Sequence, residues 1–381
     1  MPPSQADAFY EGQGVPVDLA GVEDALDRLW GPAAEKAGGP ELDDPAVTRV
    51  ALANVVLVHL GADRAGMDET TAAITTRYPS RLIVVRPTSQ GGRRLVAEVS
   101  AQCHLPAPGR PQVCSEQIIL RVGPDGLDLI PGAVRSLLES DLHTVLWWCD
   151  DPATAPDLLG SLAEGATRVI LDLPDPEADP GALSRAVEGV REHLPRDISW
   201  FGLTPWRSLI AELFDPPASS DLDRIESIRI RVLAERSDRL PRTAVWLVSW
   251  LAGQLGWRPE DRSLSDDVGR LDARFHSKSG PVRVSIETEL AEVGPMAHIA
   301  SVELGLRGDS RPAGMIRIAR NGTGSCEVRI DRDDRPAPSC PRIVKAPEYD
   351  TERRVSAALL TDRNDPPYRR ALPISRWLLG G

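Results

Sequence analysis

Two cysteines and a histidine form the tightest group of reactive side chains in this 381-residue sequence. Cys103 and His104 close one alternating stretch, and Cys114 opens the next, beyond the loop at 106–109. Cysteines that oppose each other on paired strands can meet the distance limits of a disulfide, so Cys103 and Cys114 are a candidate redox pair. Burial of two small thiols is the alternative. A tetrahedral metal site would need a distant fourth ligand, and without a Cys-x-x-Cys spacing no metal site is predicted.

Glu116 is a carboxylate at a position that the pattern marks as interior. It falls on the apolar face of its stretch, between Cys114 and Ile118. A buried carboxylate without a partner is strongly destabilising. We therefore expect an ion pair with an arginine such as Arg81, with a binding role as the alternative. Catalysis would require a second group with a shifted pKa, which the sequence does not supply, so no catalytic residue is predicted.

Tryptophan is over-used among the aromatic residues, with nine Trp against four Phe and four Tyr. Trp147 and Trp148 end an apolar strand, and Trp206 and Arg207 lie at a helix start. Rigid rings at such exits anchor either a core or a partner, and Trp and Arg are enriched in interface hot spots. Trp147, Trp148, Trp206 and Arg207 are therefore candidate partner-binding residues, with core packing as the alternative.

Asp150 and Asp172 each follow an apolar strand, where α/β proteins gather ligand groups. They carry the hypothesis of a sensor that binds a sugar phosphate or a nucleotide. Against this hypothesis, no glycine-rich loop stands between a strand and a helix. A Gly-x-Ser-x-Gly elbow and a His-x-x-x-His pair are absent from the sequence as well. We predict no cofactor and no enzymatic activity.

Among the elements that position these residues, two stretches, 95–104 and 113–122, alternate and predict a hairpin. Their apolar faces agree if Val99 opposes Ile118, a register that also sets Cys103 opposite Cys114. Over 134–194, helical and strand-like runs follow one another, which is typical of parallel strands with crossover helices. The other expected elements are helices at 47–60 and 67–78 and strands at 81–85, 143–148 and 168–171.

The second half of the chain has a different pattern. A strand at 225–233 and an apolar helix at 243–255 precede runs over 271–330 that alternate without helical period, which predicts an antiparallel meander closed by a helix at 351–360. We therefore expect an α/β N-terminal domain, with a mixed sheet and crossover helices, followed by an α+β C-terminal domain. The expected boundaries are a mobile leader at 1–46, the two domains at 47–173 and 174–365, and a tail at 366–381.

Composition limits the classes of function. The formal net charge of −12 argues against nonspecific binding of nucleic acid, because replacing phosphate counterions requires excess cation. The longest apolar stretch, 244–257, is interrupted by polar residues and is shorter than the roughly 20 residues that span a bilayer, so no membrane contact is predicted. No signal peptide is visible, and five cysteines in a long chain do not suggest a secreted disulfide framework. We expect a cytoplasmic protein.

Five blocks, in order, give the sequence a resemblance to a known family. It resembles the OpcA family, the assembly or activator protein of glucose-6-phosphate dehydrogenase, from about residue 48 to residue 257. Tyr78 stands where the family would have histidine, and Ser115 where a second cysteine is common. The blocks are Tyr78–Arg81, Ser100–His104, Gln112–Ile118, His143–Pro152 and Asp197–Pro217.

The resemblance implies a non-catalytic protein that binds glucose-6-phosphate dehydrogenase and promotes its assembly or activation in the oxidative pentose phosphate pathway. Two alternatives stay open. One is the small-molecule sensor at the strand ends, and the other is a thiol redox switch through Cys103 and Cys114.

Overall fold

The computed structural model describes two units of this chain. The N-terminal unit comprises Met1–Leu173, Arg185–Asp197 and Val355–Leu360, and the C-terminal unit comprises Pro174–Ser184, Ile198–Arg354 and Thr361–Gly381. Within them, the described residues are 10–11, 15–28, 47–61, 66–88, 91–104, 112–173, 181–190, 193–215, 218–235, 240–265, 269–292, 298–308, 314–322, 324–332, 340–361 and 364–380.

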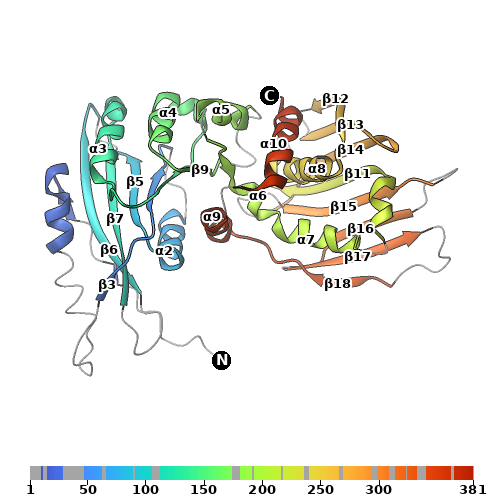
Figure 1. Cartoon of the computed structure of the whole chain (residues 1–381), viewed down its shortest axis with the longest axis horizontal. Helices are drawn as coiled ribbons and strands as arrows, with labels where there is room; N and C mark the ends of the chain where they lie inside the picture. Colours follow the sequence, from blue (N-terminus) through green and yellow to red (C-terminus); the bar gives the residue numbers. More distant parts are fainter. Residues whose placement is uncertain are drawn as a thin grey trace, which may run out of the picture. The chain divides into compact units, whose positions relative to one another are not determined.

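The N-terminal unit is built on one mixed sheet whose strands lie in the order β1-β6-β7-β5-β4-β8-β9-β10 (Figure 1). The run from β7 to β10 is parallel, and β6 pairs with β7 in the antiparallel direction. The strands of this path are β1 (Tyr10–Glu11), β4 (Asn54–Val58), β5 (Arg81–Pro87), β6 (Leu95–His104), β7 (Gln112–Val122), β8 (Thr144–Trp148), β9 (Arg168–Leu171) and β10 (Arg196–Asp197). Two further strands, β2 (Val15–Val17) and β3 (Val47–Arg49), pair with β6 and β7.

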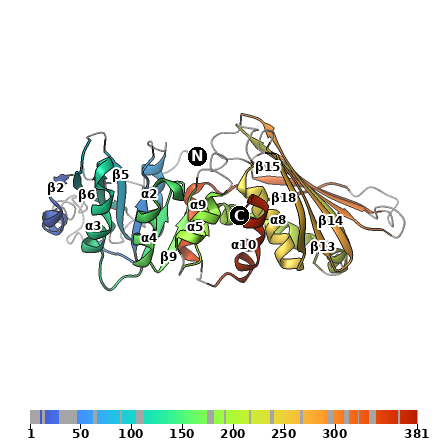
Figure 2. The same ribbon diagram turned by 90° about the horizontal axis from the view of Figure 1, so that it is seen from above.

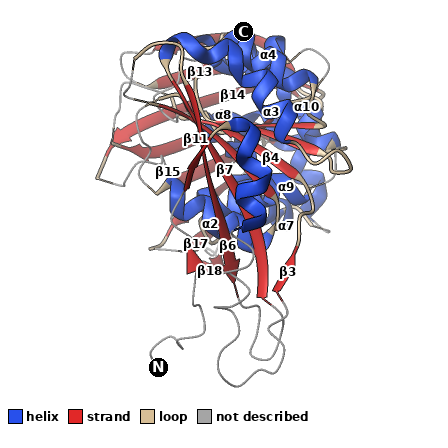
Figure 3. Ribbon diagram, turned by 90° about the vertical axis from the view of Figure 1, so that its left-hand side faces the viewer, coloured by secondary structure: helices blue, strands red, loops and turns tan. Residues whose placement is uncertain are grey.

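The parallel strands follow a doubly wound order. Numbered along the chain, β4, β5, β7, β8, β9 and β10 lie in the spatial order 3-2-1-4-5-6, with the reversal between β4 and β8. Right-handed crossovers therefore place α2 (Met67–Arg77) on one face, and α3 (Ile130–Leu137), α4 (Pro156–Glu164) and α5 (Ala182–Gly189) on the other. Figure 3 shows these helices in blue and the strands in red. The expected α/β fold with crossover helices is confirmed.

The prediction of a helix at 47–60 is wrong, because this stretch forms β3 and β4. All five residues of β4 are buried, as a central parallel strand requires. A continuous apolar run cannot be assigned to a helix or to a strand by periodicity alone. The three valines of β4, at 55, 56 and 58, favour a strand because their branched side chains restrict χ1.

The predicted hairpin and its register are confirmed. Val99 pairs with Ile118, Ala97 with Leu120 and Cys103 with Cys114 along β6 and β7. The fully buried pair Val99 and Ile118 shows why this register holds, since a slip by one residue would turn both side chains toward the opposite face.

The C-terminal unit contains a second sheet, in the order β12-β13-β14-β11-β15-β16-β17-β18. Helix α8 (Arg242–Leu255) contacts β11, β14 and β15, and α10 (Pro366–Leu379) lies along α8. Figure 2 shows both helices on one side of this sheet. The strands are β11 (Ile225–Ala234), β12 (Arg258–Ser265), β13 (Arg270–Ser277), β14 (Gly280–Leu290), β15 (His298–Leu306), β16 (Gly314–Arg320), β17 (Ser325–Arg332) and β18 (Arg342–Lys345). Its remaining helices are α6 (Ile198–Gly202) and α7 (Thr204–Leu213), and α9 (Thr351–Leu360) spans both units.

The expected antiparallel pattern is largely present but is not one continuous meander. Strand β11 inserts between β14 and β15, pairing with β14 in parallel and with β15 antiparallel. A strand that precedes the alternating region in sequence thus lies at its centre, and the local pattern carries no information about this pairing. No helix in the described part of the chain is long and apolar enough to cross a membrane.

Residues 366–381 were expected to form a tail, but most of them form α10. The helix begins at an N-cap, where the Asp365 carboxylate accepts a hydrogen bond from Tyr368 N at 3.0 Å. It ends at Gly380, which has φ 98°. Tyr368 and Leu378 are 1% and 0% exposed, because one face of α10 covers α8. The apolar spacing of this short stretch was the signal that the sequence analysis missed.

Leu378→Ala should therefore destabilise the protein by about 2–5 kcal/mol, the usual range when a buried leucine is truncated. Leu360→Ala is the matched control, because Leu360 is 69% exposed and its loss should change the free energy of unfolding by less than about 0.5 kcal/mol. Urea unfolding of both variants measures the difference. Equal midpoints for the two would contradict the placement of α10 in the core.

Candidate functional site

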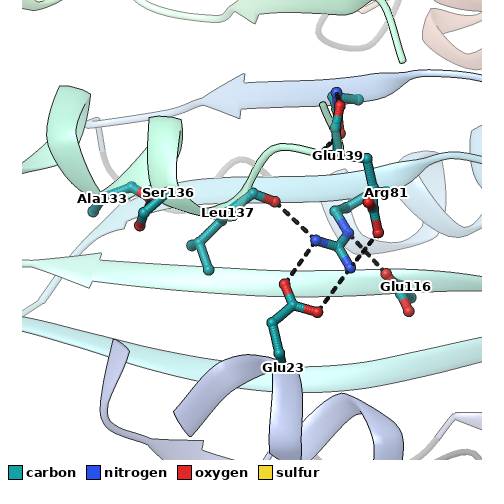
Figure 4. A network of polar contacts seen from close by, with 8 residues as sticks. Glu23, Arg81, Glu116, Ala133, Ser136, Leu137 and Glu139 are labelled. Carbon is teal, nitrogen blue, oxygen red and sulfur yellow. Dashed lines mark hydrogen bonds and ion pairs between the residues drawn. The ribbon is translucent and has the colours of Figure 1, made fainter. Parts of the chain in front are cut away.

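The most connected polar group in the N-terminal unit is the guanidinium of Arg81, the first residue of β5 and 2% exposed (Figure 4). Its Nε lies 2.8 Å from Glu116 Oε2. Arg81 is also the arginine that the sequence indicates as a partner for this carboxylate. Two more carboxylates approach the other nitrogens, Glu23 on Nη1 and Glu139 on Nη2, each at 2.8 Å. The carbonyl oxygen of Leu137 accepts a further hydrogen bond from Nη1 at 3.0 Å.

The carboxylates hold Arg81 in its charged form. Burial by itself lowers the pKa of Arg81, but the hydrogen bond that Arg81 donates to Glu23 and the charges of Glu116, Glu23 and Glu139 outweigh it and raise the pKa overall. Glu116 is 4% exposed, so its charge is compensated inside the protein. Glu23 belongs to a helix over 22–28, which Arg81 thereby ties to the sheet.

Trp147 and Trp148, two of the candidate partner-binding residues, are both 0% exposed. Successive strand residues point to opposite faces, and β8 lies inside a parallel sheet that is covered by helices on both faces. Neither indole nitrogen has a hydrogen-bond partner among the residues that the structure describes. A partner could reach either ring only after β8 had been uncovered.

Trp206 and Arg207, the other two candidates, lie on α7 in the C-terminal unit. Trp206 is 4% exposed, whereas Arg207 is half-buried. The guanidinium carbon of Arg207 lies 3.8 Å from the ring centroid of Trp200, and the Trp200 indole donates to Asp365 Oδ2 at 3.0 Å. Burial lowers the pKa of Arg207 to about 10, and the charge of Asp365 opposes this shift. These contacts assign Arg207 a packing role on its inner side.

The Trp200 ring continues into an aromatic core that the sequence analysis did not foresee. Its centroid lies 5.6 Å from that of Trp246 and 5.3 Å from that of Tyr368, both in edge-to-face geometry. Trp246 and Tyr368 stack at 5.0 Å. Because these rings come from α6, α8 and α10, only the tertiary structure brings them together.

The backbone pairs Cys103 with Cys114, as the predicted hairpin requires, but their side chains lie outside the described residues. The redox pair therefore stays a prediction. Three other cysteines form no disulfide, namely Cys149 and Cys326, which are buried, and Cys340, which is exposed. The described residues contain no cluster of His, Cys, Asp and Glu that could hold a metal ion.

The carboxylates at the strand ends are engaged within the protein. Asp150, which follows β8, accepts hydrogen bonds from Leu60 N at 2.6 Å and from Gly61 N at 3.1 Å. Asp151 accepts from both Ala153 N and Arg185 Nη2. Asp172, after β9, is 2% exposed. The sensor hypothesis placed its ligand beside Asp150 and Asp172, and both carboxylates are buried there.

Tyr78 lies at the opposite, amino-terminal edge of the parallel strands, in the first block of the family resemblance. Its hydroxyl lies 3.1 Å from His143 Nε2. Where the family would have a histidine at position 78, this chain has a tyrosine that contacts a histidine from another segment. Burial raises the pKa of Tyr78, and the charge of Arg168 opposes the shift. The phenol therefore stays protonated at neutral pH and can donate to the imidazole.

Arg81→Gln should destabilise the protein by about 3–5 kcal/mol, because it leaves the Glu116 carboxylate buried without its cation. Adding Glu116→Gln should recover part of this loss, since the buried pair then carries no charge. Arg93→Gln is the control, because Arg93 and Asp128 are both 60% exposed and such a pair contributes at most about 1 kcal/mol. If urea unfolding places Arg81→Gln within 1 kcal/mol of wild type, the network does not hold this unit together.

Comparison with known proteins finds a family match for each half of the chain. Residues 71–188 match the family described as glucose-6-phosphate dehydrogenase subunit N-terminal domain, and residues 195–372 match its C-terminal domain. A protein named OxPP cycle protein OpcA from Synechococcus elongatus is 30% identical over 190 residues, which is 49% of this chain and 42% of the relative. Its namesake from Synechocystis sp. is 30% identical over 242 residues, 62% of this chain and 48% of the relative. The aligned part thus spans about half the length of the curated relatives.

Among solved structures, glucose-6-phosphate 1-dehydrogenase from Mycobacterium avium superposes with a TM-score of 0.54, over 87% of this chain and 91% of that chain. The two sequences are 11% identical, so this likeness concerns the fold alone. With its two halves matched by the two domains of one family, the chain belongs to the OpcA family of glucose-6-phosphate dehydrogenase assembly proteins.

Proposed function

We propose that this protein is a non-catalytic partner of glucose-6-phosphate dehydrogenase that promotes its assembly or allosteric activation in the oxidative pentose phosphate pathway. The observation that carries the proposal is the family match, whose two domains are described as parts of a glucose-6-phosphate dehydrogenase subunit. Its relatives carry the name of an OxPP cycle protein. The protein would act where that pathway runs, in the cytoplasm.

The absence of enzymatic activity is part of the proposal. The fold resembles that of a dehydrogenase, but fold does not determine function, which depends on the site. The sequence contains neither a Gly-x-Gly-x-x-Gly nor a Gly-x-x-x-x-Gly-Lys motif. Asp150 and Asp151, the carboxylates nearest to the reversal of strand order, are bound to backbone N–H groups and to Arg185. Neither is placed as a free acid or base.

Activation by such a partner follows from linkage. A protein that binds the active conformation or oligomer of the dehydrogenase more tightly than the inactive one shifts the population toward the active form. The shift can be no larger than the ratio of the two affinities, so a tenfold preference gives at most a tenfold change in the equilibrium. No chemistry by the partner is required.

For the contact surface, we propose the outer face of α7. Trp147, Trp148 and Trp206 are buried, which leaves Arg207 as the candidate with solvent access. Ser208, Ala211 and Glu212 are exposed on the same helix. The inner face of α7 is fixed by Trp206, so the outer face is presented on a rigid support.

The first experiment measures the velocity of the cognate dehydrogenase against glucose 6-phosphate, with and without the purified protein. We expect a higher velocity or a lower half-saturating substrate concentration, together with a complex of defined mass in native mass spectrometry. The complex then distinguishes a permanent subunit from a factor that leaves. Unchanged kinetics with no complex would refute the proposed function.

Ser208→Arg should weaken the complex at least tenfold, because it adds a long charged side chain to the outer face of α7 without disturbing the core. The same change on an exposed helix of the N-terminal unit, Ser136→Arg on α3, is the matched control and should leave affinity unchanged. Affinities come from calorimetric titration, and melting curves confirm that both variants fold. Equal affinity for Ser208→Arg and wild type would remove α7 from the contact surface while leaving the partnership intact.

A further inference from the structure

The strand order of the first sheet creates a position where folds of this kind bind anions. In a 3-2-1-4-5-6 sheet, the chain leaves the first and fourth strands in opposite directions, and ligand phosphates lie against the backbone N–H groups that follow the first strand. Here the first strand is β4 and the fourth is β8, hydrogen-bonded neighbours in parallel register. The N–H groups after β4 that the structure describes include those of Leu60 and Gly61.

These two N–H groups already hold a carboxylate. Asp150, two residues beyond the end of β8, places Oδ2 2.6 Å from Leu60 N and Oδ1 3.1 Å from Gly61 N. One oxygen meets each donor, which is the arrangement that backbone amides use to bind an anion. Asp150 is 8% exposed, and a Cβ at Gly61 would lie 3.2 Å from Oδ1, so the turn fits closely around this carboxylate.

Two described arginines near the same edge are also paired with carboxylates. Arg86, near the end of β5, corresponds to the place where such folds select the ribose of a dinucleotide, and its guanidinium is bound by Asp68 from the first turn of α2. Arg185 on α5 binds both carboxylate oxygens of Asp151, at 3.1 and 3.0 Å. Among the residues that the structure describes, these two guanidiniums and the two N–H groups therefore all face carboxylates of the chain itself.

We propose that the turn after β4 is a dinucleotide-type anion site that the protein fills with its own Asp150 carboxylate, and that removing this carboxylate opens the site to phosphate. The charge already present repels a second anion and occupies both donors. The full chain consequently binds no dinucleotide at this edge, although its sheet has the order that such ligands use. The inference rests on Asp150 and its two donors and does not depend on the identity of the partner protein.

Three full-length variants test this inference by thermal unfolding in chloride buffer, with and without millimolar inorganic phosphate at constant ionic strength. Asp150→Ala should lower Tm by roughly 3–10 °C, because it leaves the N–H groups of Leu60 and Gly61 without their carboxylate acceptor, and phosphate should restore part of the loss. Asp150→Asn should also lower Tm but show no response to phosphate, because the amide still fills the site. Glu164→Ala, which removes an exposed carboxylate from α4, should match wild type in both buffers.

Wild type is titrated separately with NADP+ by calorimetry, and no heat of binding is expected. Saturable binding of NADP+ to wild type would overturn the inference, and so would a Tm of Asp150→Ala that phosphate leaves unchanged. If Asp150→Ala does not fold, the wild-type titration and the loss of Tm in Asp150→Asn decide the question. Dehydrogenase activation is measured independently, so its failure would leave this result standing.

Discussion

The buried pair between Arg81 and Glu116 is the interaction on which the order of the N-terminal unit depends. These residues face each other in the parallel register of β5 and β7, and Glu116 also faces Ala101 in the antiparallel register of β7 and β6. A slip by one residue on either side would turn the carboxylate toward the opposite face and leave two charges uncompensated in the interior. One ion pair thus penalises misregister in three neighbouring strands. Through Glu23 and Glu139, the same guanidinium also reaches a helix and the chain just before β8.

Part of this arrangement could be predicted from the sequence because it is local. The alternation on either side of the 106–109 loop determines which side chains share a face, and Glu116 stands out as the one carboxylate on an apolar face. A buried charge demands a partner, so the sequence also indicated an arginine. Glu23 and Glu139 could not be found in this way, because Glu23 is exposed and Glu139 half-buried, and their local pattern is that of ordinary surface residues. Likewise, β4 is a buried run whose length and apolar character suit a helix equally well until its neighbours are known.

The tryptophans show a different limit. Rings at strand exits must anchor something, but the choice between core and partner depends on what covers the strand. For Trp147 and Trp148, the cover is supplied by helices from other parts of the chain and by a strand order that no local pattern reveals. For Trp206, it is supplied by the C-terminal unit, where Arg320 lies 5.5 Å from its ring centroid. The three tryptophans chosen for their residue type alone are therefore buried, because solvent access depends on the tertiary structure.

A protein that has the fold of a dehydrogenase and belongs to a family of dehydrogenase assembly proteins poses a physical question: what distinguishes the partner from the enzyme? The fold supplies a switch point with free backbone donors, and an enzyme would keep those donors for a phosphate. In this chain, the Asp150 carboxylate accepts from both donors. A hydrogen-bond donor that loses its acceptor is destabilising, so this carboxylate stabilises the turn without any ligand. Under the inference proposed above, the same carboxylate occupies the donors that a phosphate would need, which agrees with the proposed role of a partner that acts through its surface.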